Sequence, residues 1–222
     1  MNIIIANINK VHHIVENFCM QEFNAEIAHS SQELREKMKG KEIDFIFFLH
    51  WSELISKEIY DNYRCIVFHM TDLPFGRGGS PLQNLIIRGY TETKISAIRV
   101  CKELDAGDIY LKKELSLHGT AEEIFIRTGK IMLEMIREIM CSDIIPSPQE
   151  GYPILFKRRK PEDGNIVNLD SIEQIYDYIR MLDAEGYPNA FLINGAMKFE
   201  FSRASLKADG VILADVKISK IK

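Results

Sequence analysis

The stretch CIVFHMTDLPFGRGGSPLQNLIIR, residues 65–88, joins an apolar run to an amphipathic segment through a glycine-rich turn. The apolar run predicts a buried strand that ends at His69. Ser80 and Pro81 predict the start of a helix that runs to Arg88, since proline is favoured in a first helical turn. A strand–helix connection needs only a few residues. The longer polar segment between them therefore predicts a loop that holds a ligand.

The residues before this stretch show the same alternation of short apolar runs and amphipathic segments. Ser30 and Glu33 form a capping box at the start of one helix. We expect strands at 2–6 and 44–49, and helices at 12–23, 30–38 and 55–60. This order predicts a parallel sheet with helices on both faces. Ligands bind beyond the carboxyl ends of strands in such sheets, which is where His69 lies.

The alternation of strands and helices ends after residue 93. Period-2 patterns predict strands at 94–101 and 109–117, joined by KELDAGD, and Thr120 with Glu123 predicts the cap of a helix that reaches about Met140. Apolar residues at helical spacing in this helix predict core packing. The segment SDIIPSPQEGYP, residues 142–153, predicts a domain boundary, which gives domains at 1–145 and 146–222.

The second domain is small and mostly β. We expect a strand at 154–158, a helix capped by Ser171 and Gln174, and a β meander with a type I′ turn at Asn194 and Gly195. The predicted fold class is α/β: a Rossmann-like open parallel sheet with a small C-terminal, mostly β subdomain.

The composition is that of a soluble globular protein. Of the 222 residues, 46% are hydrophobic and 27% are charged, and the formal net charge is -4. This charge gives no overall attraction for nucleic acid or for an anionic membrane. No apolar run is long enough to cross a bilayer, and the N-terminus does not look like a signal peptide, so we expect a cytoplasmic protein.

Cysteine spacing gives no sign of a metal site. The four cysteines (Cys19, Cys65, Cys101 and Cys141) are scattered without a CxxC pair, which disfavours zinc binding and gives no disulfide framework. We expect no metal, and we expect the thiols to be free and buried.

Two polar motifs could carry chemistry. A lone histidine at the end of a strand is more often structural, and LDAGD, residues 104–108, could be an ordinary turn. A carboxylate beside His69 would orient the ring and stabilise its charged form, as a general base requires. The segment GRGGSP allows close backbone approach and could meet a phosphate, although a glycine-rich turn alone signals only a turn.

These motifs resemble those of a known family. The run from His69 to Gly78 resembles the HxSLLPxxxG motif of the folate-dependent N-formyltransferases, and LDAGD resembles their LDxGD loop. RRKPEDGNI (158–166) and YPNAF (187–191) also look like theirs, so the resemblance covers nearly the whole chain. It implies the formyltransferase fold and transfer of a formyl group from N10-formyltetrahydrofolate, a co-substrate, to an amine.

The resemblance also implies roles for individual residues. The catalytic histidine is His69, and the catalytic aspartate is assigned to Asp108, the second aspartate of the loop. Thr71 takes the place of a serine of the motif as catalytic support. The family's catalytic asparagine falls on Val67, which cannot donate a hydrogen bond. Another donor would then have to replace it: protonated His69, a backbone N–H or a water held by Thr71.

Further residues are expected to hold the two substrates. The donor would contact His50, Trp51, Ser52, Leu104, Asp105 and Gly107, with Trp51 either an apolar wall or simply part of the core. The acceptor's phosphates would meet Arg77, Gly78, Gly79, Lys157 and Arg158, although a basic run is more often a solvated surface. Asp72 replaces an apolar residue of the motif and is expected either to pair with Arg77 or to contact the acceptor.

Among relatives, the run from His69 to Gly89 most resembles enzymes that act on nucleotide-linked amino sugars. The implied acceptor is a UDP- or dTDP-linked 4-amino-4,6-dideoxy sugar of the pseudaminic acid type, used for surface polysaccharide. We expect no nucleic-acid partner and no membrane partner, with a homodimer as an assembly to test. Two alternatives stay open: hydrolysis of the formyl donor to formate, and a non-catalytic nucleotide-sugar-binding module, which Val67 favours.

Overall fold

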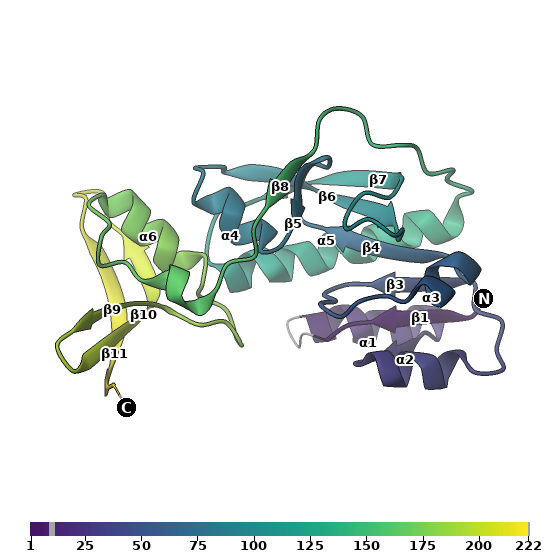
Figure 1. Ribbon diagram of the computed structural model, residues 1–222, viewed down its shortest axis with the longest axis horizontal. Helices are drawn as coiled ribbons and strands as arrows, with labels where there is room; N and C mark the ends of the chain where they lie inside the picture. Colours follow the sequence, from purple (N-terminus) through teal and green to yellow (C-terminus); the bar gives the residue numbers. More distant parts are fainter. Residues whose placement is uncertain (9–11, 222) are drawn as a thin grey trace. The chain divides into compact units, whose positions relative to one another are not determined.

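The computed structural model describes residues 1–8 and 12–221, and the chain forms two compact units (Figure 1). The first unit comprises Met1–Gly78, Thr93–Leu115 and Phe125–Leu155. The second comprises Gly79–Glu92, Ser116–Ile124 and Phe156–Lys222. Each unit is built from segments that are separated in sequence. A boundary near residue 145 between two functional domains stays a prediction.

The first unit is built on a six-stranded sheet with the order β2-β1-β3-β4-β6-β7. β1 is parallel to β2 and β3, β3 is parallel to β4, and β4 is antiparallel to β6. The strands are β1 (Ile3–Ala6), β2 (Glu26–Ala28), β3 (Phe45–Phe48), β4 (Cys65–His69), β6 (Glu92–Arg99) and β7 (Ile109–Ser116). The Rossmann-like, mostly parallel sheet is confirmed. The prediction missed β2, whose three residues are too few to show a period.

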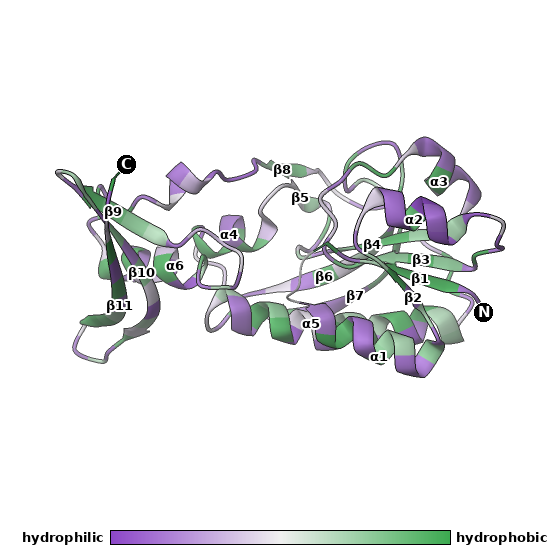
Figure 2. Cartoon of the chain, turned by 90° about the horizontal axis from the view of Figure 1, so that it is seen from below, coloured by the Kyte–Doolittle hydropathy of each residue, from purple (hydrophilic) through white to green (hydrophobic). Residues whose placement is uncertain are grey.

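Helices cover both faces of this sheet. Figure 2 shows α1 (His13–Phe23) and α5 (Ala121–Cys141) on one face, and α2 (Ser31–Met38) and α3 (Lys57–Asn62) on the other. The cap of α2 is confirmed, since Ser30 Oγ accepts a hydrogen bond from the Glu33 N–H at 3.2 Å. The cap of α5 is confirmed too: the Glu123 N–H donates to Thr120 Oγ1 at 3.2 Å, and the Thr120 N–H donates to Glu123 Oε2 at 2.8 Å.

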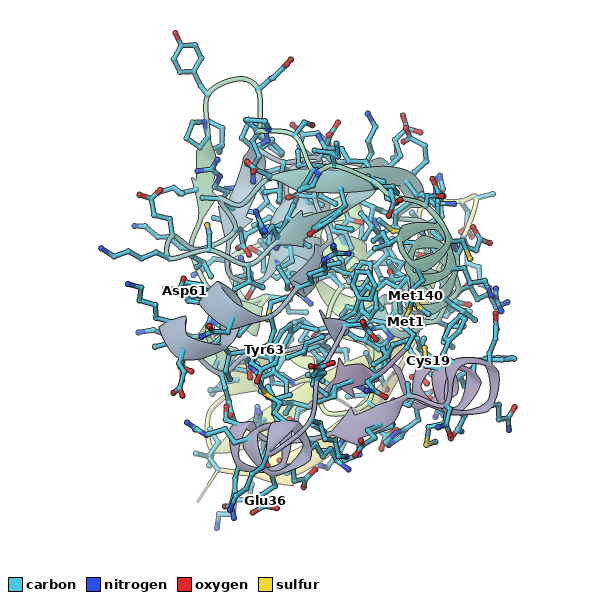
Figure 3. All side chains as sticks on the ribbon, turned by 90° about the vertical axis from the view of Figure 1, so that its right-hand side faces the viewer. Met1, Cys19, Glu36, Asp61, Tyr63 and Met140 are labelled. Atoms are coloured by element: carbon cyan, nitrogen blue, oxygen red, sulfur yellow. The ribbon has the colours of Figure 1, made fainter. Side chains whose placement is uncertain are left out.

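The core forms where the strands carry continuous apolar runs. Every residue of β1 and of β3 is buried, as expected for parallel strands covered on both faces. Of the expected inward stripe of α5, Ile124, Met135 and Ile139 are buried and Ile131 is half-buried. Polar residues such as Glu36 of α2 and Asp61 of α3 lie at the outer side of the unit (Figure 3).

The four cysteines are free but differ in their environment. Cys19, labelled in Figure 3, and Cys65 are buried, and burial raises the pKa of each thiol to about 12. Cys101 is half-buried and Cys141 is exposed, so the expectation of four buried thiols was wrong. Cys141 is the last residue of α5.

The second unit contains a three-stranded antiparallel sheet with the order β11-β10-β9. The strands are β9 (Ala190–Asn194), β10 (Met197–Leu206) and β11 (Ile212–Lys220), and the helical elements are α4 (Pro81–Ile86), the 3-10 turn η2 (Pro161–Gly164) and α6 (Ile172–Arg180). α6 packs against β10. The expected cap of α6 is confirmed, because Ser171 Oγ accepts a hydrogen bond from the Gln174 N–H at 3.4 Å.

The hairpin turn between β9 and β10 differs from the prediction by one residue. Asn194 pairs with Met197, so the two-residue loop consists of Gly195 and Ala196. Of these two residues only Gly195 has a positive φ, at 60°. A type I′ turn needs a positive φ at both central residues, whereas a type II′ turn needs it only at the first. The type I′ turn at Asn194–Gly195 was therefore wrong.

A two-stranded ribbon, which the sequence did not predict in full, follows the end of β4. It joins β5 (Phe75–Gly78) to β8 (Ile154–Phe156). The loop after His69 thus contains a strand of its own. Across the described ranges 1–8 and 12–221, no helix has the length and hydropathy needed to cross a membrane.

Candidate active site

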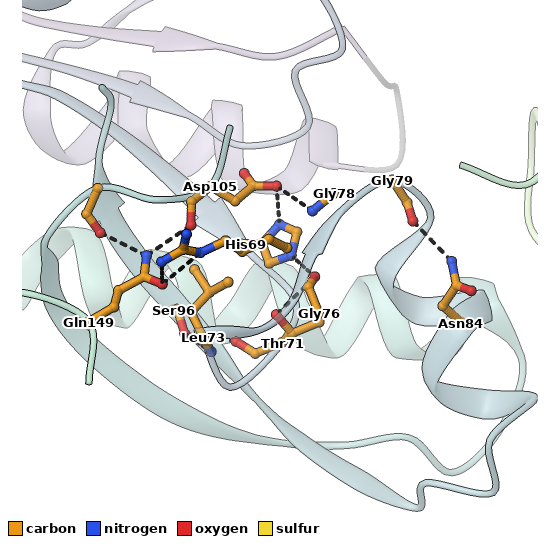
Figure 4. Close-up of polar contacts among 12 residues, drawn as sticks. His69, Thr71, Leu73, Gly76, Gly78, Gly79, Asn84, Ser96, Asp105 and Gln149 are labelled. Atoms are coloured by element: carbon orange, nitrogen blue, oxygen red, sulfur yellow. Dashed lines mark hydrogen bonds and ion pairs between the residues drawn. The ribbon is translucent and has the colours of Figure 1, made fainter. Parts of the chain in front are cut away.

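His69 is the last residue of β4, and its side chain is buried at the carboxyl edge of the parallel strands. Its Nε2 lies 2.7 Å from the Gly76 carbonyl oxygen (Figure 4). A carbonyl oxygen can only accept a hydrogen bond, so Nε2 must carry the hydrogen. In the neutral ring, Nδ1 is then the basic nitrogen. The loop after β4 therefore selects the tautomer in which Nδ1 can take up a proton.

The carboxylate that faces Nδ1 belongs to Asp105. Asp105 Oδ2 lies 3.5 Å from His69 Nδ1, and the two side chains are only 10% and 8% exposed. The same oxygen accepts a hydrogen bond from the Gly78 N–H at 2.9 Å. Both ring nitrogens thus face oxygen atoms, an arrangement that suits the doubly protonated imidazolium.

Asp108, the aspartate assigned to this role from the resemblance, is not the one that reaches His69. The Asp108 carbonyl accepts a hydrogen bond from the Arg99 N–H at 2.8 Å, which fixes Asp108 between the ends of β6 and β7. Asp105 precedes this anchored point and lies in the part of the loop that turns toward His69. Its left-handed backbone conformation, with a φ of 53°, contributes to that turn.

Gly107 allows the loop to pack directly on the sheet. A Cβ atom at this position would lie 1.7 Å from the Arg99 carbonyl oxygen, which is far inside any allowed contact. Gly107 was expected to contact the formyl donor. In the structure it is buried and provides close backbone approach, which only glycine can give here.

The donor groups expected to meet a phosphate have partners within the protein. The Arg77 guanidinium donates from Nε and Nη2 to Gln149 Oε1, at 3.1 and 2.8 Å. The Gly78 N–H is bound to Asp105, as described above. The Gly79 N–H donates to the Phe156 carbonyl at 3.3 Å. The glycine-rich loop is therefore not an open anion-binding cradle in this conformation.

The start of α4 also differs from the expected cap. Pro81 occupies the first helical turn, as predicted, but Ser80 has a φ of 52° and its side chain does not cap the helix. Ser80 Oγ instead accepts a hydrogen bond from the Arg159 N–H at 3.0 Å. Ser80 therefore holds the chain that follows β8, and α4 ends at Ile86, two residues before the expected Arg88.

Gln149 is a site-linked residue that the sequence did not single out. Its Nε2 donates to the Asp105 carbonyl at 2.8 Å and to the Gly107 carbonyl at 2.9 Å. Together with the bonds from Arg77, its amide joins the two loops that flank His69 (Figure 4). The surrounding SPQEG looked like linker composition, so no pattern in the sequence distinguished it.

Asp72 forms a surface ion-pair network with two lysines. Lys94 Nζ lies 3.1 Å from Asp72 Oδ2, and Lys112 Nζ binds the other carboxylate oxygen. Burial acts to raise the pKa of Asp72, but the bonds from Lys112 and Lys94 outweigh it and hold this pKa below its usual range. The expected pairing with Arg77 was wrong, because the Arg77 guanidinium is turned toward Gln149 instead.

Val67 and Thr71 lie two residues before and two residues after His69 in the sequence. Val67 is half-buried within β4, in register with Phe48 of β3 and Ile98 of β6. Thr71 is fully buried, and its hydroxyl donates to the Gly76 carbonyl at 3.5 Å. The Thr71 carbonyl accepts a hydrogen bond from Ser96 Oγ at 2.7 Å. Thr71 therefore braces the loop that carries Gly76.

The segment expected to hold the formyl donor follows β3. The Trp51 ring packs edge-on against Phe48, at 5.4 Å between centroids, and contributes to the core. Its indole Nε1 is buried and has no hydrogen-bond partner among the described residues. Ser52 and Leu104, the latter 74% exposed, offer surface for a ligand.

His50 lies beside a second buried histidine, His12, which the prediction did not include. The two rings are 5.9 Å apart. Burial, with a smaller contribution from His50, lowers the pKa of His12 to about 3, so His12 is neutral at physiological pH. In the parts of the chain that the structure describes, no cluster of His, Cys, Asp or Glu side chains has the arrangement of a metal site.

Lys157 and Arg158 belong to the second unit and are both exposed. The Lys157 carbonyl accepts a hydrogen bond from Asn84 Nδ2 at 2.9 Å. The Arg158 backbone packs so closely on Gly79 that a Cβ on this glycine would lie 2.6 Å from the Arg158 Cβ. The backbone of this basic run is therefore fixed, while both side chains stay in solvent.

Comparisons with known proteins agree with the motifs. The profile of the family described as "Formyl transferase" matches residues 7–130, and that of "Methionyl-tRNA formyltransferase, C-terminal domain" matches residues 161–219. A solved structure of a methionyl-tRNA formyltransferase from Clostridium thermocellum is 51% identical, with a TM-score of 0.94, and the match covers 99% of each chain.

Among the curated relatives, the match covers only part of each protein. Methionyl-tRNA formyltransferase of Clostridium botulinum is 30% identical over 160 residues, which cover 68% of this chain and 52% of the relative. The chain thus spans about half the length of the curated relatives it matches.

One solved formyltransferase shares only the fold. PseJ from Anoxybacillus kamchatkensis, whose structure holds UDP-4,6-dideoxy-4-formamido-L-AltNAc and tetrahydrofolate, is 17% identical, with a TM-score of 0.56 over 73% of this chain and 89% of that one. The profile that matches more than half of the chain decides the family. The chain described here belongs to the formyl transferase family.

Proposed function

We propose that the protein transfers a formyl group from N10-formyltetrahydrofolate to the amine of a nucleotide-linked amino sugar. The observation that carries the proposal is the buried pair of His69 Nδ1 and Asp105 Oδ2, 3.5 Å apart, in a chain of the formyl transferase family. A basic nitrogen and a carboxylate held next to each other are what removal of a proton from an attacking amine requires.

The reaction would begin with attack of the amine lone pair on the formyl carbon. The C=O π electrons move to the formyl oxygen, and the amine proton passes to His69 Nδ1. The tetrahedral intermediate then collapses: its C–N10 bond breaks, N10 takes the proton back from the imidazolium, and tetrahydrofolate leaves. Protons and electrons balance, and the step needs no metal.

Asp105 would act through charge and orientation. Its carboxylate faces the nitrogen that becomes protonated, so it stabilises the imidazolium when that ion forms. The Gly78 N–H fixes the carboxylate, and the Gly76 carbonyl fixes the ring. The two groups are therefore positioned before the substrates arrive, which is the condition for efficient proton transfer.

The formyl oxygen needs a donor as negative charge develops on it. Val67 supplies none, and loss of one such donor costs other enzymes about 3 to 4 kcal/mol. Thr71 is fully buried, so its hydroxyl cannot take over. Both ring N–H groups of His69 are directed at the Gly76 carbonyl and Asp105, so we assign stabilisation of the oxygen to the positive charge of the imidazolium, which forms in the same step.

Residues of the first unit would hold the folate. The indole N–H of Trp51 is buried without a partner among the described residues, so it has an unused donor for a heteroaromatic ligand. His50, Ser52 and Leu104, together with the 104–108 loop, provide the remaining surface. The tetrahydrofolate in the PseJ structure supports a folate donor for this fold.

Two observations bear on the acceptor. The net charge of -4 argues against a large polyanion. The UDP-linked formamido sugar bound in the PseJ structure supports a nucleotide-linked sugar. Against this, the 51% identical structure carries the name methionyl-tRNA formyltransferase, which makes methionyl-tRNA the second candidate.

A single assay separates these candidates. The protein is incubated with N10-formyltetrahydrofolate and, in parallel, with UDP- and dTDP-linked amino sugars and with methionyl-tRNA. We expect one sugar to gain the mass of a formyl group. Formylation of methionyl-tRNA alone would refute the sugar assignment while keeping formyl transfer.

The same assay tests the two rival functions. Formate released without any acceptor would identify a hydrolase. Nucleotide-sugar binding without turnover, whichever acceptor is added, would identify a binding module and would refute formyl transfer altogether.

A further inference from the structure

The side-chain amide of Gln149 is held by four hydrogen bonds. Its oxygen accepts from Arg77 Nε and Nη2, and its nitrogen donates to the carbonyls of Asp105 and Gly107. A guanidinium only donates and carbonyls only accept, so the orientation of the amide is fixed by chemistry. Glutamine matches both sets of partners, whereas glutamate would turn a second oxygen toward two carbonyls.

We propose that Gln149 is a positioning residue that locks the 104–108 loop to the segment containing Arg77, so that Asp105 faces His69. The two carbonyls it binds lie on either side of Ala106, so one side chain fixes the loop at two points. The Asp105 side chain then has only one direction in which to project, toward Gly78 and His69.

The segment that carries Gln149 is itself anchored. Two residues earlier, Ser147 exchanges backbone hydrogen bonds with Ile109 at the start of β7, at 2.7 and 3.0 Å. Gln149 is therefore attached to the sheet on one side and to both site loops on the other. All of these residues belong to the first unit.

Asp105 needs such support, because its own backbone does not favour the observed conformation. A φ of 53° is uncommon for residues other than glycine and persists where surrounding contacts determine it. The bond from Gln149 to the Asp105 carbonyl is one of those contacts. Loss of that bond frees the residue to relax and turns its carboxylate away from His69.

The test uses Gln149→Glu, which keeps the Arg77 side and removes the donor to the two carbonyls. Gln83→Glu is the control: Gln83 is more deeply buried than the half-buried Gln149 and donates to one carbonyl, that of Met181, but it belongs to the second unit. Gln149→Met, which has a similar shape and no hydrogen bonds, serves as the second variant if Gln149→Glu does not fold.

The first readout is the ¹⁵N NMR signals of the His69 ring, with Asp105→Asn as the reference for a lost carboxylate. We expect a Gln149 variant to shift these signals in the same direction as Asp105→Asn, and Gln83→Glu to leave them unchanged. This readout does not depend on formyl transfer, so it holds even where the proposed function fails. Unchanged His69 signals in a folded Gln149 variant would overturn the inference.

The kinetic readout rests on the proposed function. Misplacement of a catalytic group by about 1 Å can cost about 100-fold in rate, so we expect kcat to fall about 10- to 100-fold with little change in the KM of the acceptor. In an Asp105→Asn background the same Gln149 substitution should have almost no further effect on kcat. Additive losses would show that Gln149 does not act through Asp105.

Discussion

The two halves of one glycine-rich motif do different work. Gly76 and Gly78 bind the ring and the carboxylate of the site through their backbone groups. The following residues, 79–84, bind the backbone of 156–159: the Gly79 N–H reaches Phe156, and Asn84 reaches Lys157. A glycine-rich loop before a helix is therefore not by itself a phosphate site. What matters is whether its N–H groups already have partners.

Asp105→Asn, in the half of the site that contains His69, is expected to have the largest effect on kcat. Asparagine has the same shape and can still accept from the Gly78 N–H, so only the charge that faces His69 is lost. We expect kcat to fall about 100-fold, the lower end of the range for acid–base groups, with the thermal unfolding temperature nearly unchanged. Asp108→Asn is the control. A larger loss from Asp108→Asn would mean that the resemblance placed the catalytic aspartate correctly.

A second substitution tests the close approach of the loop to the sheet. In Gly107→Ala the new methyl group would lie 1.7 Å from the Arg99 carbonyl oxygen, so the loop must move. We expect about a tenfold or larger loss of kcat, together with lowered stability. Gly210→Ala, which strains the backbone at a φ of 79° but places the added atom in open space, shows the cost of backbone strain without a steric clash. Equal behaviour of the two variants would contradict the packing role.

The other half of the motif should respond in stability rather than in turnover. Asn84 is buried, and its Nδ2 serves the carbonyls of Gly79, Ser80 and Lys157 at 2.9 to 3.0 Å. Asn84→Ala leaves these acceptors without the donor, which we expect to lower the free energy of unfolding by about 1 to 3 kcal/mol.

Urea unfolding measures this loss, and kcat should stay near the wild-type value. Asn62→Ala removes one bond, from Nδ2 to the Glu58 carbonyl on an exposed helix, and should cost much less. A kcat that falls as steeply in Asn84→Ala as in Asp105→Asn would break the distinction between the two halves.

The smallest effect is expected from Asp72. Its folded-state pKa lies below the ordinary value of about 3.9, so its contribution to stability is present above pH 4 and is lost as the pH falls through the folded-state pKa. The pair is exposed to solvent and screened by salt, which limits its contribution to well under 1 kcal/mol. The free energy of unfolding of Asp72→Asn should be slightly lower than that of wild type at pH 7, and the two should be equal at low pH, where the wild-type carboxyl is protonated and neutral. A difference at both pH values would point to a role beyond the ion pair.

Local signals in the sequence were sufficient where the structure depends on neighbouring residues. The side-chain N-caps at Ser30 and Thr120 and the strand that ends at His69 were all predicted, because each depends on residues within a few positions. The site motifs were also recognisable by resemblance. Several strand boundaries differ from the prediction by one or two residues. Hydrogen bonding to the neighbouring strands, and not the β propensity of the residues, decides where a strand ends.

The missed features depend on contacts between distant segments. Nothing in the sequence decides which aspartate of LDAGD faces His69, because that depends on where Arg99 anchors the loop. Gln149 binds partners 42 to 72 residues away, so no local pattern marks it. The same holds for Ser80, whose hydroxyl binds Arg159 instead of capping its own helix.

We propose His69, oriented by the Gly76 carbonyl and faced by Asp105, as the base of a formyl-transfer site. The most direct measurement is the rate of formyl transfer from N10-formyltetrahydrofolate to the identified acceptor, compared between wild type and His69→Gln. We expect this rate to fall about 100-fold or more, with an unchanged fold by circular dichroism. A His69→Gln variant that keeps near-wild-type turnover would contradict it.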